Sequence, residues 1–311
     1  MKRLKAINFY LCKIPSPLSG LALALVSLGL GWESAISVNG FTQSLGAILA
    51  SFILILLFLK FTINPSILNK ELQNPTTGSV IPTLAMAVMV VANTIGLYNV
   101  KAGQAISWFA ITLHLCFLIA FAFFQIKNIK LKQILPSWFI PPIGLALATV
   151  THPGGLPATM SHILLILGLL SYAVLLPIIL YRLLFSGPLD DSQKPTIAIL
   201  ATPASLLIIV YLTVTTDINM LFFSALMIIA ILMTLYVYFA FINLLTLPFS
   251  PAYSAFTFPL VVNAIALFKI NSLFLQEGGS TLWAQLANIQ LAIATVMVIY
   301  VTYRSLRFFR L

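Results

Sequence analysis

The sequence predicts an all-α integral membrane protein of ten transmembrane helices, paired as five helical hairpins. The chain of 311 residues is 61% hydrophobic and only 7% charged, whereas a soluble domain carries about 25% charged residues. Its apolar runs are long and continuous, as membrane helices require, and they lack the alternating polarity of barrel strands. Prolines also recur along the chain at a nearly constant spacing, which indicates a repeated two-helix unit.

Ten apolar segments are long enough to cross a bilayer, which takes about 20 helical residues. Their expected limits are 15–33, 41–61, 80–98, 103–126, 136–152, 159–184, 196–214, 220–245, 254–270 and 282–303. The connections are short and carry turn residues, as in NKELQNPTTGS, THPGGLPA and SGPLDDSQKP. None of them has room for a soluble domain. We therefore expect one transmembrane channel or transporter domain over residues 1–311.

The cations predict the orientation, because Lys and Arg gather in cytoplasmic loops. Ten spans place both termini on one side, and fourteen of the sixteen Lys and Arg residues fall on that side. They are Lys2, Arg3, Lys5, Lys13, Lys60, Lys70, Lys127, Lys130, Lys132, Arg182, Lys194, Arg304, Arg307 and Arg310. The other side receives Lys101 and Lys269. We therefore expect a multi-pass protein of the cell membrane with both termini in the cytoplasm.

The odd-numbered segments carry the repeat, in the stretches SGLALALVSL, VIPTLAMAVM, FIPPIGLALA, LATPASLLII and FTFPLVVNAI. Ala22 takes the central place in the first, and the others hold Pro82, Pro142 (or its neighbour Pro141), Pro203 and Pro259. These positions are 60, 60, 61 and 56 residues apart, the length of a helical hairpin. One such proline is explained by the general frequency of proline in membrane helices. Four prolines at a near-constant period favour helices arranged around an axis. There, the carbonyls that proline leaves unbonded can accept hydrogen bonds from neighbouring helices or water. We therefore expect the odd segments inside and the even segments outside.

Small and hydroxylic residues of the odd segments are the candidates for lining a pore. Hydroxyls and freed backbone groups solvate an ion weakly, which lets the ion leave again. The alternative role for each of them is interhelical hydrogen bonding or close packing. Together with the prolines at the kinks, the candidates are Ser19, Gly20, Pro82, Thr83, Pro141, Pro142, Gly144, Thr202, Pro203, Ser205, Thr257 and Pro259.

Four stretches, in their order and spacing, resemble the tellurite-resistance/dicarboxylate transporter family, which includes the TehA-like bacterial proteins and is related to the plant slow-type guard-cell anion channels. They are SGLALALVSLGLGW, LPSWFIPPIGLA, TIAILATPASLLIIVYL and SAFTFPLVVNA. The resemblance covers essentially the whole chain. It implies five hairpins in quasi-five-fold symmetry around a pore, and a homo-trimer in which each subunit has its own pore. The first segment departs from the pattern because it lacks the central proline.

The stretch SAFTFPLVVNA matches the part of the family that carries a pore-occluding phenylalanine, and the matching position is Phe258. Phe256 lies two residues earlier, about 200° away around a helix, so the two side chains cannot both face the axis. The alternative for Phe258 is packing in the core or against lipid. We expect Phe258 to be the gate of the pore.

A lack of acidic residues inside the segments indicates a pathway for anions. All six fall in connections or at segment ends: Glu33, Glu71, Asp190, Asp191, Asp217 and Glu277. Ion-coupled carriers usually hold ionisable groups at membrane depth, and His114 and His162, on even segments, are expected to be structural. The sequence therefore predicts a gated, largely passive pathway for small inorganic or organic anions. Lys13, Lys60 and Lys127 are candidates to attract a dicarboxylate at the mouth.

The alternative function is a proton-coupled or exchange carrier for C4-dicarboxylates, tellurite or sulfite, since a substrate that carries its own proton needs no carboxylate in the protein. An enzyme is not expected, because His152 and His162 have no Asp or Glu beside them and the chain has no phosphate-binding glycine loop. We expect no cofactor, no metal and no nucleic-acid partner. The basic run KNIKLKQ flanks a span and suits contact with membrane lipid.

Overall fold

The computed structural model describes residues 8–127, 129–276 and 282–309. Five residues that the sequence analysis named lie outside the described residues: Lys2, Arg3, Lys5, Glu277 and Arg310. Within the described ranges, nine helices are long and apolar enough to cross a membrane. They are α2 (Leu18–Ile36), α3 (Phe41–Ile63), α5 with α6 (Pro75–Val80 and Pro82–Tyr98), α7 (Val100–Ile126), α10 (Ala158–Phe185), η4 with α11 (Lys194–Ala201 and Thr202–Val214), α12 (Met220–Leu244), η5 with α13 (Pro251–Phe256 and Phe258–Gln276) and α14 (Leu282–Phe309).

The segment expected as the fifth span is broken into short pieces, so it does not count among those nine. It consists of η2 (Pro136–Phe139), α8 (Ile140–Gly144), η3 (Leu145–Leu147) and α9 (Ala148–Thr151). Two adjacent prolines, Pro141 and Pro142, remove two backbone donors at its centre. A regular α-helix cannot run through such a pair, because each proline also clashes with the turn before it.

The prolines of the odd segments lie where one helical piece ends and the next begins. Pro82 opens α6, and Pro203 and Pro259 are the second residues of α11 and α13. Proline is tolerated in the first turn of a helix, since no intrahelical partner awaits its missing N–H. Hydroxyls add bonds to carbonyls just before two of these prolines: Thr83 donates to the Val80 carbonyl at 2.7 Å and Thr257 to the Ser254 carbonyl at 2.6 Å. In these three segments a change between helical pieces therefore falls at or directly before the proline.

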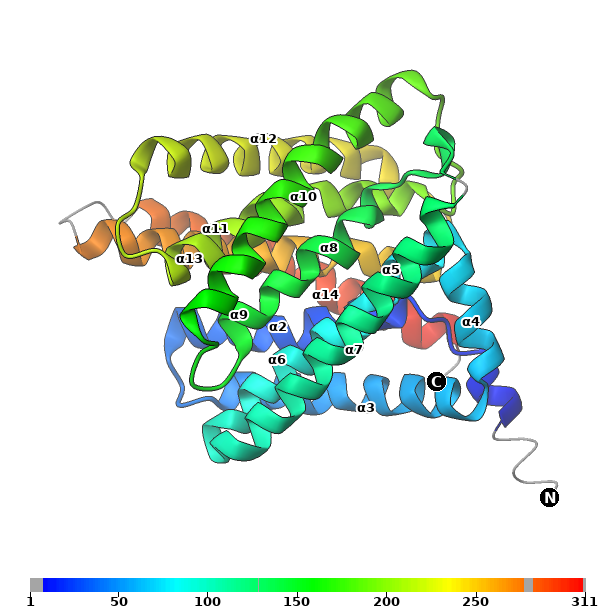
Figure 1. The fold of residues 1–311 in the computed structure, drawn as a ribbon, viewed down its shortest axis with the longest axis horizontal. Helices are drawn as coiled ribbons and strands as arrows, with labels where there is room; N and C mark the ends of the chain where they lie inside the picture. The colour runs from blue at the N-terminus through cyan, green and yellow to red at the C-terminus, as the bar shows by residue number, and fades with distance from the viewer. Residues whose placement is uncertain (1–7, 128, 277–281, 310–311) are drawn as a thin grey trace.

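The odd elements form a closed ring in the order of the chain. Helix α2 contacts α6 and α13, α6 contacts α8 and α9, and α11 contacts α9 and α13. The other long helices pack behind this ring: α3 on α2 and α6, α7 on α6 and α8, α10 on α8 and α11, α12 on α11, and α14 on α13 and α2. Figure 1 shows α3 and α12 along opposite margins of the bundle, with α2, α11 and α13 between them.

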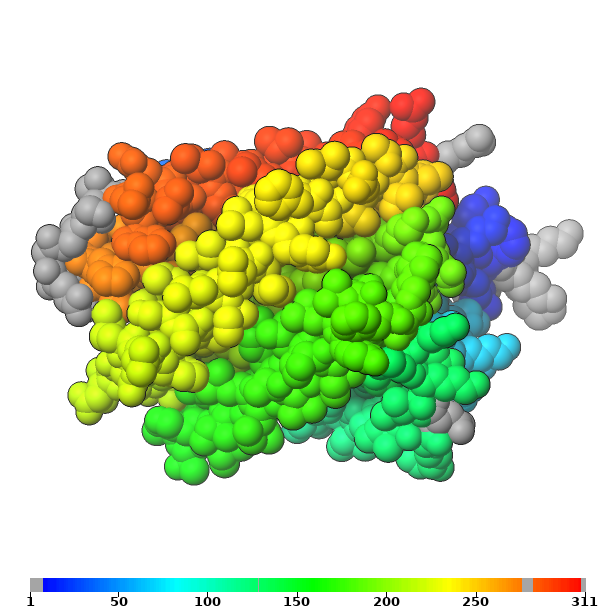
Figure 2. Space-filling model, turned by 90° about the horizontal axis from the view of Figure 1, so that it is seen from above, coloured from blue at the N-terminus to red at the C-terminus, as the bar shows by residue number. Residues whose placement is uncertain are grey.

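Burial separates the two sets of helices. The most apolar stretches of the four long odd elements are 50% to 78% buried, whereas those of α3, α7, α10, α12 and α14 are 22% to 39% buried. Figure 2 shows one face of the molecule on which α7, α10, α12 and α14 follow one another. Their outward side chains are large and apolar, such as Leu221, Phe239 and Val296. This surface suits contact with lipid.

The connection between the second and third spans is helical, and the expectation of an irregular turn-rich loop there is wrong. Residues Pro65–Gln73 form α4, and α5 begins at Pro75. Asparagine followed by proline opens both helices, and the Asn74 side chain accepts from the backbone N–H groups of Thr76 and Thr77. This combination of an N-cap and a first-turn proline is a helix start signal that we read as a turn.

One end of the bundle gathers α4, the start of α2 and the end of α14 (Figure 1). The helices α3, α7 and α10 end where the sequence places Lys60, Lys127 and Arg182. We call this end the basic end.

Candidate functional site

A cavity of about 80 Å³ lies inside the ring, and every odd element contributes to its wall. We call it the axial cavity. It is lined near the start of each odd element, which places it in the half of the bundle toward the basic end. The lining includes Gly20 and Leu23 from α2, Thr83 and Met86 from α6, Ile143 and Gly144 from α8, Thr202, Pro203 and Leu206 from α11, and Phe258 and Pro259 from α13.

The two phenylalanines of the last odd element have different surroundings. Phe258 lines the axial cavity and is 7% exposed. Phe256 is fully buried against the rings of Tyr253 and Phe241, with ring centroids 4.6 and 5.2 Å away. The break between η5 and α13 falls between the two residues, so their side chains diverge. Of these two phenylalanines, Phe258 is the one that lines the axial cavity, and Phe139 of η2 lines it as well.

The structure brings seven of the residues singled out from the sequence to the cavity wall: Gly20, Thr83, Gly144, Thr202, Pro203, Phe258 and Pro259. It places the other six outside that wall: Ser19, Pro82, Pro141, Pro142, Ser205 and Thr257. Each of these six is within three residues of a lining residue on the same odd segment. Helical rotation of about 100° per residue turns them toward neighbouring helices instead.

Most hydroxyls around the cavity hydrogen-bond within the protein. Ser19 donates to the Ser16 carbonyl at 2.7 Å and lies 2.6 Å from the Thr83 hydroxyl, which itself bonds the Val80 carbonyl. Such bonds repair the breaks between helical pieces, which is the structural role that small polar residues often have in membranes. Thr202 differs, because its buried hydroxyl has no hydrogen-bond partner among the described residues although the residue lines the cavity.

Gly144 is required by close packing. A Cβ on Gly144 would lie 2.6 Å from the sulfur of Met86 and 3.0 Å from Cε1 of His114, both closer than ordinary contact. His114 is fully buried on α7, and its Nε2 lies 2.8 Å from the Pro141 carbonyl of the broken segment. The sequence suggested a structural histidine here but gave no sign that it supports the broken segment.

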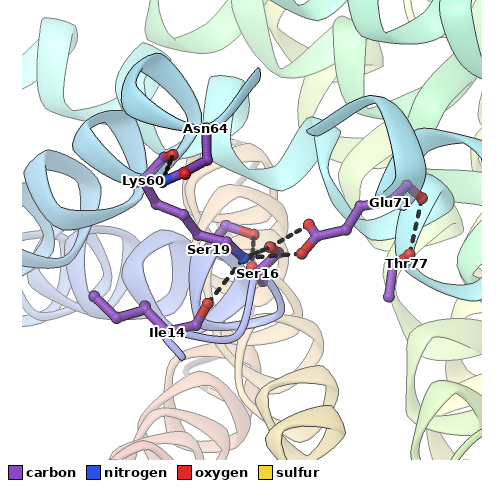
Figure 3. Close-up of polar contacts among 7 residues, drawn as sticks. All are labelled: Ile14, Ser16, Ser19, Lys60, Asn64, Glu71 and Thr77. Carbon is purple, nitrogen blue, oxygen red and sulfur yellow. Dashed lines mark hydrogen bonds and ion pairs between the residues drawn. The ribbon is translucent and has the colours of Figure 1, made fainter. Parts of the chain in front are cut away.

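A buried ion pair joins the end of α3 to α4, and Figure 3 shows its contacts. The ammonium of Lys60 is 2.8 Å from the carboxylate of Glu71 on α4, and the Lys60 side chain is 2% exposed. The same ammonium donates to the Ile14 carbonyl and the Ser16 hydroxyl, at 2.9 and 2.8 Å. Ser16 in turn donates to the Glu71 carboxylate. The interpretation of Lys60 as a cation available to anions at the mouth is therefore wrong, because its charge is enclosed and paired.

Hydrogen bonds connect this ion pair to the cavity wall. Ser16 bonds both charged groups, its carbonyl accepts from Ser19, and Ser19 contacts the cavity-lining Thr83. The backbone carbonyl of Glu71 also accepts from the hydroxyl of Thr77, another cavity-lining residue, at 2.8 Å (Figure 3). The ion pair therefore joins α3 and α4 to the start of α2, α5 and α6. Sequence reasoning missed it because Glu71 was assigned to a loop.

Comparisons with known proteins agree with a membrane transport protein. The model of the voltage-dependent anion channel family matches residues 17–306 of this chain. The uncharacterized transporter MJ0762 of Methanocaldococcus jannaschii is 28% identical over 261 residues, covering 73% of this chain and 74% of that protein. A second uncharacterized transporter of the same organism, MJ0576, is 27% identical over 232 residues, covering 64% of this chain and 66% of that protein. The chain is therefore a multi-pass membrane protein that belongs to the voltage-dependent anion channel family.

Proposed function

We propose that the protein is a gated, largely passive pathway for small anions, and that the ring of Phe258 closes it. The axial cavity carries this proposal, because elements from the whole length of the chain surround it and the ring of Phe258 forms part of its wall, with Phe139 as the other aromatic lining residue. An apolar constriction of this kind blocks ions by excluding water as well as by its bulk. Rotation of one side chain would then change conduction without rearranging the ring.

The electrostatics of the wall favour anions over cations. No Asp or Glu lies among the residues that line the axial cavity. The nearest acidic group described in the network around the cavity, Glu71, is neutralised by Lys60 at 2.8 Å. The unpaired Thr202 hydroxyl offers one weak donor inside the cavity. Weak binding of this kind lets an ion leave as readily as it binds.

The proposal includes ten crossings in quasi-five-fold arrangement, with the broken segment Pro136–Thr151 as the fifth. The closed order of contacts among the odd elements supports this, as do the start of α2 and the end of α14 at one end of the bundle (Figure 1). The start of α2 and the end of α14 can lie at the same end of the bundle only if the chain crosses the membrane an even number of times. The proposal further has the whole chain as one domain, both termini in the cytoplasm of the cell membrane, and a homo-trimer with one pathway in each subunit.

The test is the anion current of the purified protein in planar bilayers, compared between the wild type and Phe258→Ala. We expect a large rise in current for the variant, with a reversal potential in a salt gradient that indicates anion selectivity. Phe239→Ala is the matched control, because Phe239 is 71% exposed on the outer face of α12. Its current should equal that of the wild type.

The competing function is a carrier for dicarboxylates or oxyanions. The absence of current in both the wild type and Phe258→Ala, together with malate uptake into vesicles driven by a pH gradient, would replace the channel proposal with the carrier. Uptake that follows the membrane potential alone and rises in Phe258→Ala would support the channel.

A further inference from the structure

A second cavity, of about 460 Å³, opens next to the axial cavity at the basic end. We call it the vestibule. Its wall comes from the Asn74–Thr76 start of α5, the short helix η1 (Leu131–Gln133), the end of α10 and the connection that follows it. The polar groups that matter here are Thr76, Lys132, Gln133, Arg182, Asp190 and Gln193. Neither the repeat nor the gate motif points to this place.

Arg182 is the central group of the vestibule. The residue is only 4% exposed, and its guanidinium donates to the Gly187 carbonyl at 2.8 Å and to the Lys132 carbonyl at 3.3 Å. Its buried Nε has no hydrogen-bond partner, and no carboxylate lies within ion-pair distance of it among the described residues. A buried charge without a counter-charge is costly. The two carbonyls fix the guanidinium in place and leave donors and a full positive charge for a ligand.

The remaining charges of the vestibule leave it positive. Lys132 contributes a second cation from an exposed position, and Asp190 contributes one carboxylate, which is exposed to solvent. Gln133 and Gln193 add neutral amides that can donate hydrogen bonds. A concave surface with fixed positive charge concentrates anions from solution.

The vestibule and the axial cavity share one wall. Thr76 lines both cavities, and its hydroxyl accepts a hydrogen bond of 3.2 Å from the Gln193 side chain. One turn after Gln193, Thr196 lines the axial cavity and bonds the Gln193 carbonyl at 2.6 Å. A ligand in the vestibule is therefore separated from the axial cavity by the side chains of Thr76 and Gln193.

We propose that the vestibule binds a small oxyanion through Arg182 and Lys132, and that this is where the transported anion is collected before it passes Thr76. This inference rests on the proposed function. The fork of guanidinium donors suits a carboxylate or a tetrahedral oxyanion, which accept two hydrogen bonds side by side. The cavity has room for an ion larger than chloride. We take the ligand to be an oxyanion dissolved in water. The alternative ligand is an anionic lipid headgroup, which has the same charge and hydrogen-bond acceptors.

The binding test uses radiolabelled sulfate and the full chain in phosphatidylcholine nanodiscs. We expect saturable binding to the wild type, weakened about threefold in Lys132→Gln, as for an exposed charge, and about tenfold in Arg182→Gln, as for a charge-assisted hydrogen bond. Lys130→Gln is the matched control, because Lys130 is exposed on the same segment and does not line the vestibule. Arg182 also donates hydrogen bonds to two backbone carbonyls, so Arg182→Gln could prevent folding. In that case the sulfate affinity of Lys132→Gln tests the proposal.

Three outcomes overturn the inference: no saturable binding to the wild type, equal weakening by Lys130→Gln and Lys132→Gln, or loss of sulfate binding when phosphatidylglycerol replaces phosphatidylcholine. The last would assign the vestibule to a lipid headgroup. Binding that survives phosphatidylglycerol supports a free anion.

Measurements of sulfate current distinguish a failure of the vestibule inference from a failure of the proposed channel function. In the Phe258→Ala background, Lys132→Gln should raise the sulfate concentration for half-maximal current, applied from the basic end, by about threefold and leave the maximal current unchanged. Binding without current in any variant would overturn the channel and leave the vestibule as an anion site. Current whose concentration dependence is the same with and without Lys132 would overturn the vestibule and leave the channel.

Discussion

The ammonium of Lys60 lies 2.8 Å from the carboxylate of Glu71, and these side chains are 2% and 21% exposed. The pair joins the end of α3 to α4, and Ser16 links it to the start of α2. Removal of one partner leaves the other charge buried without compensation, which is far more costly than the loss of an exposed pair.

We expect Glu71→Gln to lower the stability of the protein by about 3 kcal/mol, because Lys60 would keep a buried charge. The measurement is the thermal unfolding midpoint in detergent. The control is Asp191→Asn, since the Asp191–Lys194 pair is exposed and such pairs contribute little. The double variant Lys60→Met with Glu71→Met should recover most of the loss. Equal changes in the unfolding midpoint for Glu71→Gln and Asp191→Asn would show that the buried pair contributes no more to stability than the exposed pair.

Gly144→Ala should disturb the packing between α8 and α6. The new methyl group would lie 2.6 Å from the sulfur of Met86, so that side chain must move or the segment must shift. We expect a loss of about 1 to 3 kcal/mol, typical of overpacking, and partial rescue by Met86→Ala. Gly20→Ala is the control, because its methyl group would meet Ser254 at an ordinary 3.4 Å. The thermal midpoints of the four proteins test this, and a Gly144→Ala midpoint at the wild-type value would contradict it.

Phe256→Ala should lower stability without raising the current, whereas Phe258→Ala should raise the current. Phe256 is completely buried against Tyr253 and Phe241, so its loss should cost about 3 to 5 kcal/mol and open nothing. Phe258→Ala should raise the current, and Phe258→Leu should give an intermediate current because leucine is smaller than phenylalanine. Bilayer currents and unfolding midpoints, measured on the same preparations of each variant, test these expectations. A rise in current for Phe256→Ala would mean that the wrong phenylalanine has been assigned as the gate.

Thr202→Val should affect conduction rather than stability. The Thr202 hydroxyl is buried at the cavity wall without a hydrogen-bond partner among the described residues, so its replacement by a methyl group removes an unpaired polar atom at no cost in protein hydrogen bonds. In the Phe258→Ala background we expect a lower anion current, because one weak donor inside the pathway is lost. Thr83→Val is the contrasting variant, since the Thr83 hydroxyl bonds Ser19 and Val80. It should lower the unfolding midpoint, and a similar drop for Thr202→Val would indicate a structural role there instead.

The sequence by itself determined the class of the protein, the position of nearly every membrane helix and the place of each break. Low charge and long apolar runs leave helices as the structure that satisfies the backbone in lipid. The prolines of the odd segments disfavour a continuous helix, although Pro177 lies inside the unbroken helix α10. The proline repeat also distinguished the odd segments, whose four long elements are more buried than the even helices. Seven of the thirteen residues that we singled out, Phe258 and Gly20 among them, line the axial cavity.

Tertiary structure alone decided which side chains line that cavity and which charges remain available. Ser19 and Thr83 are both hydroxylic residues of odd segments, but only the helix rotation and packing show that Thr83 lines the wall and Ser19 supports it from behind. Lys60 and Arg182 are both cations at helix ends in the sequence. In the folded chain Lys60 meets Glu71 on α4, whereas the hydrogen-bond partners of Arg182 among the described residues are backbone carbonyls. Pairings of this kind join residues that are far apart along the chain or on different helices, and local patterns of hydrophobicity and proline carry no information about them.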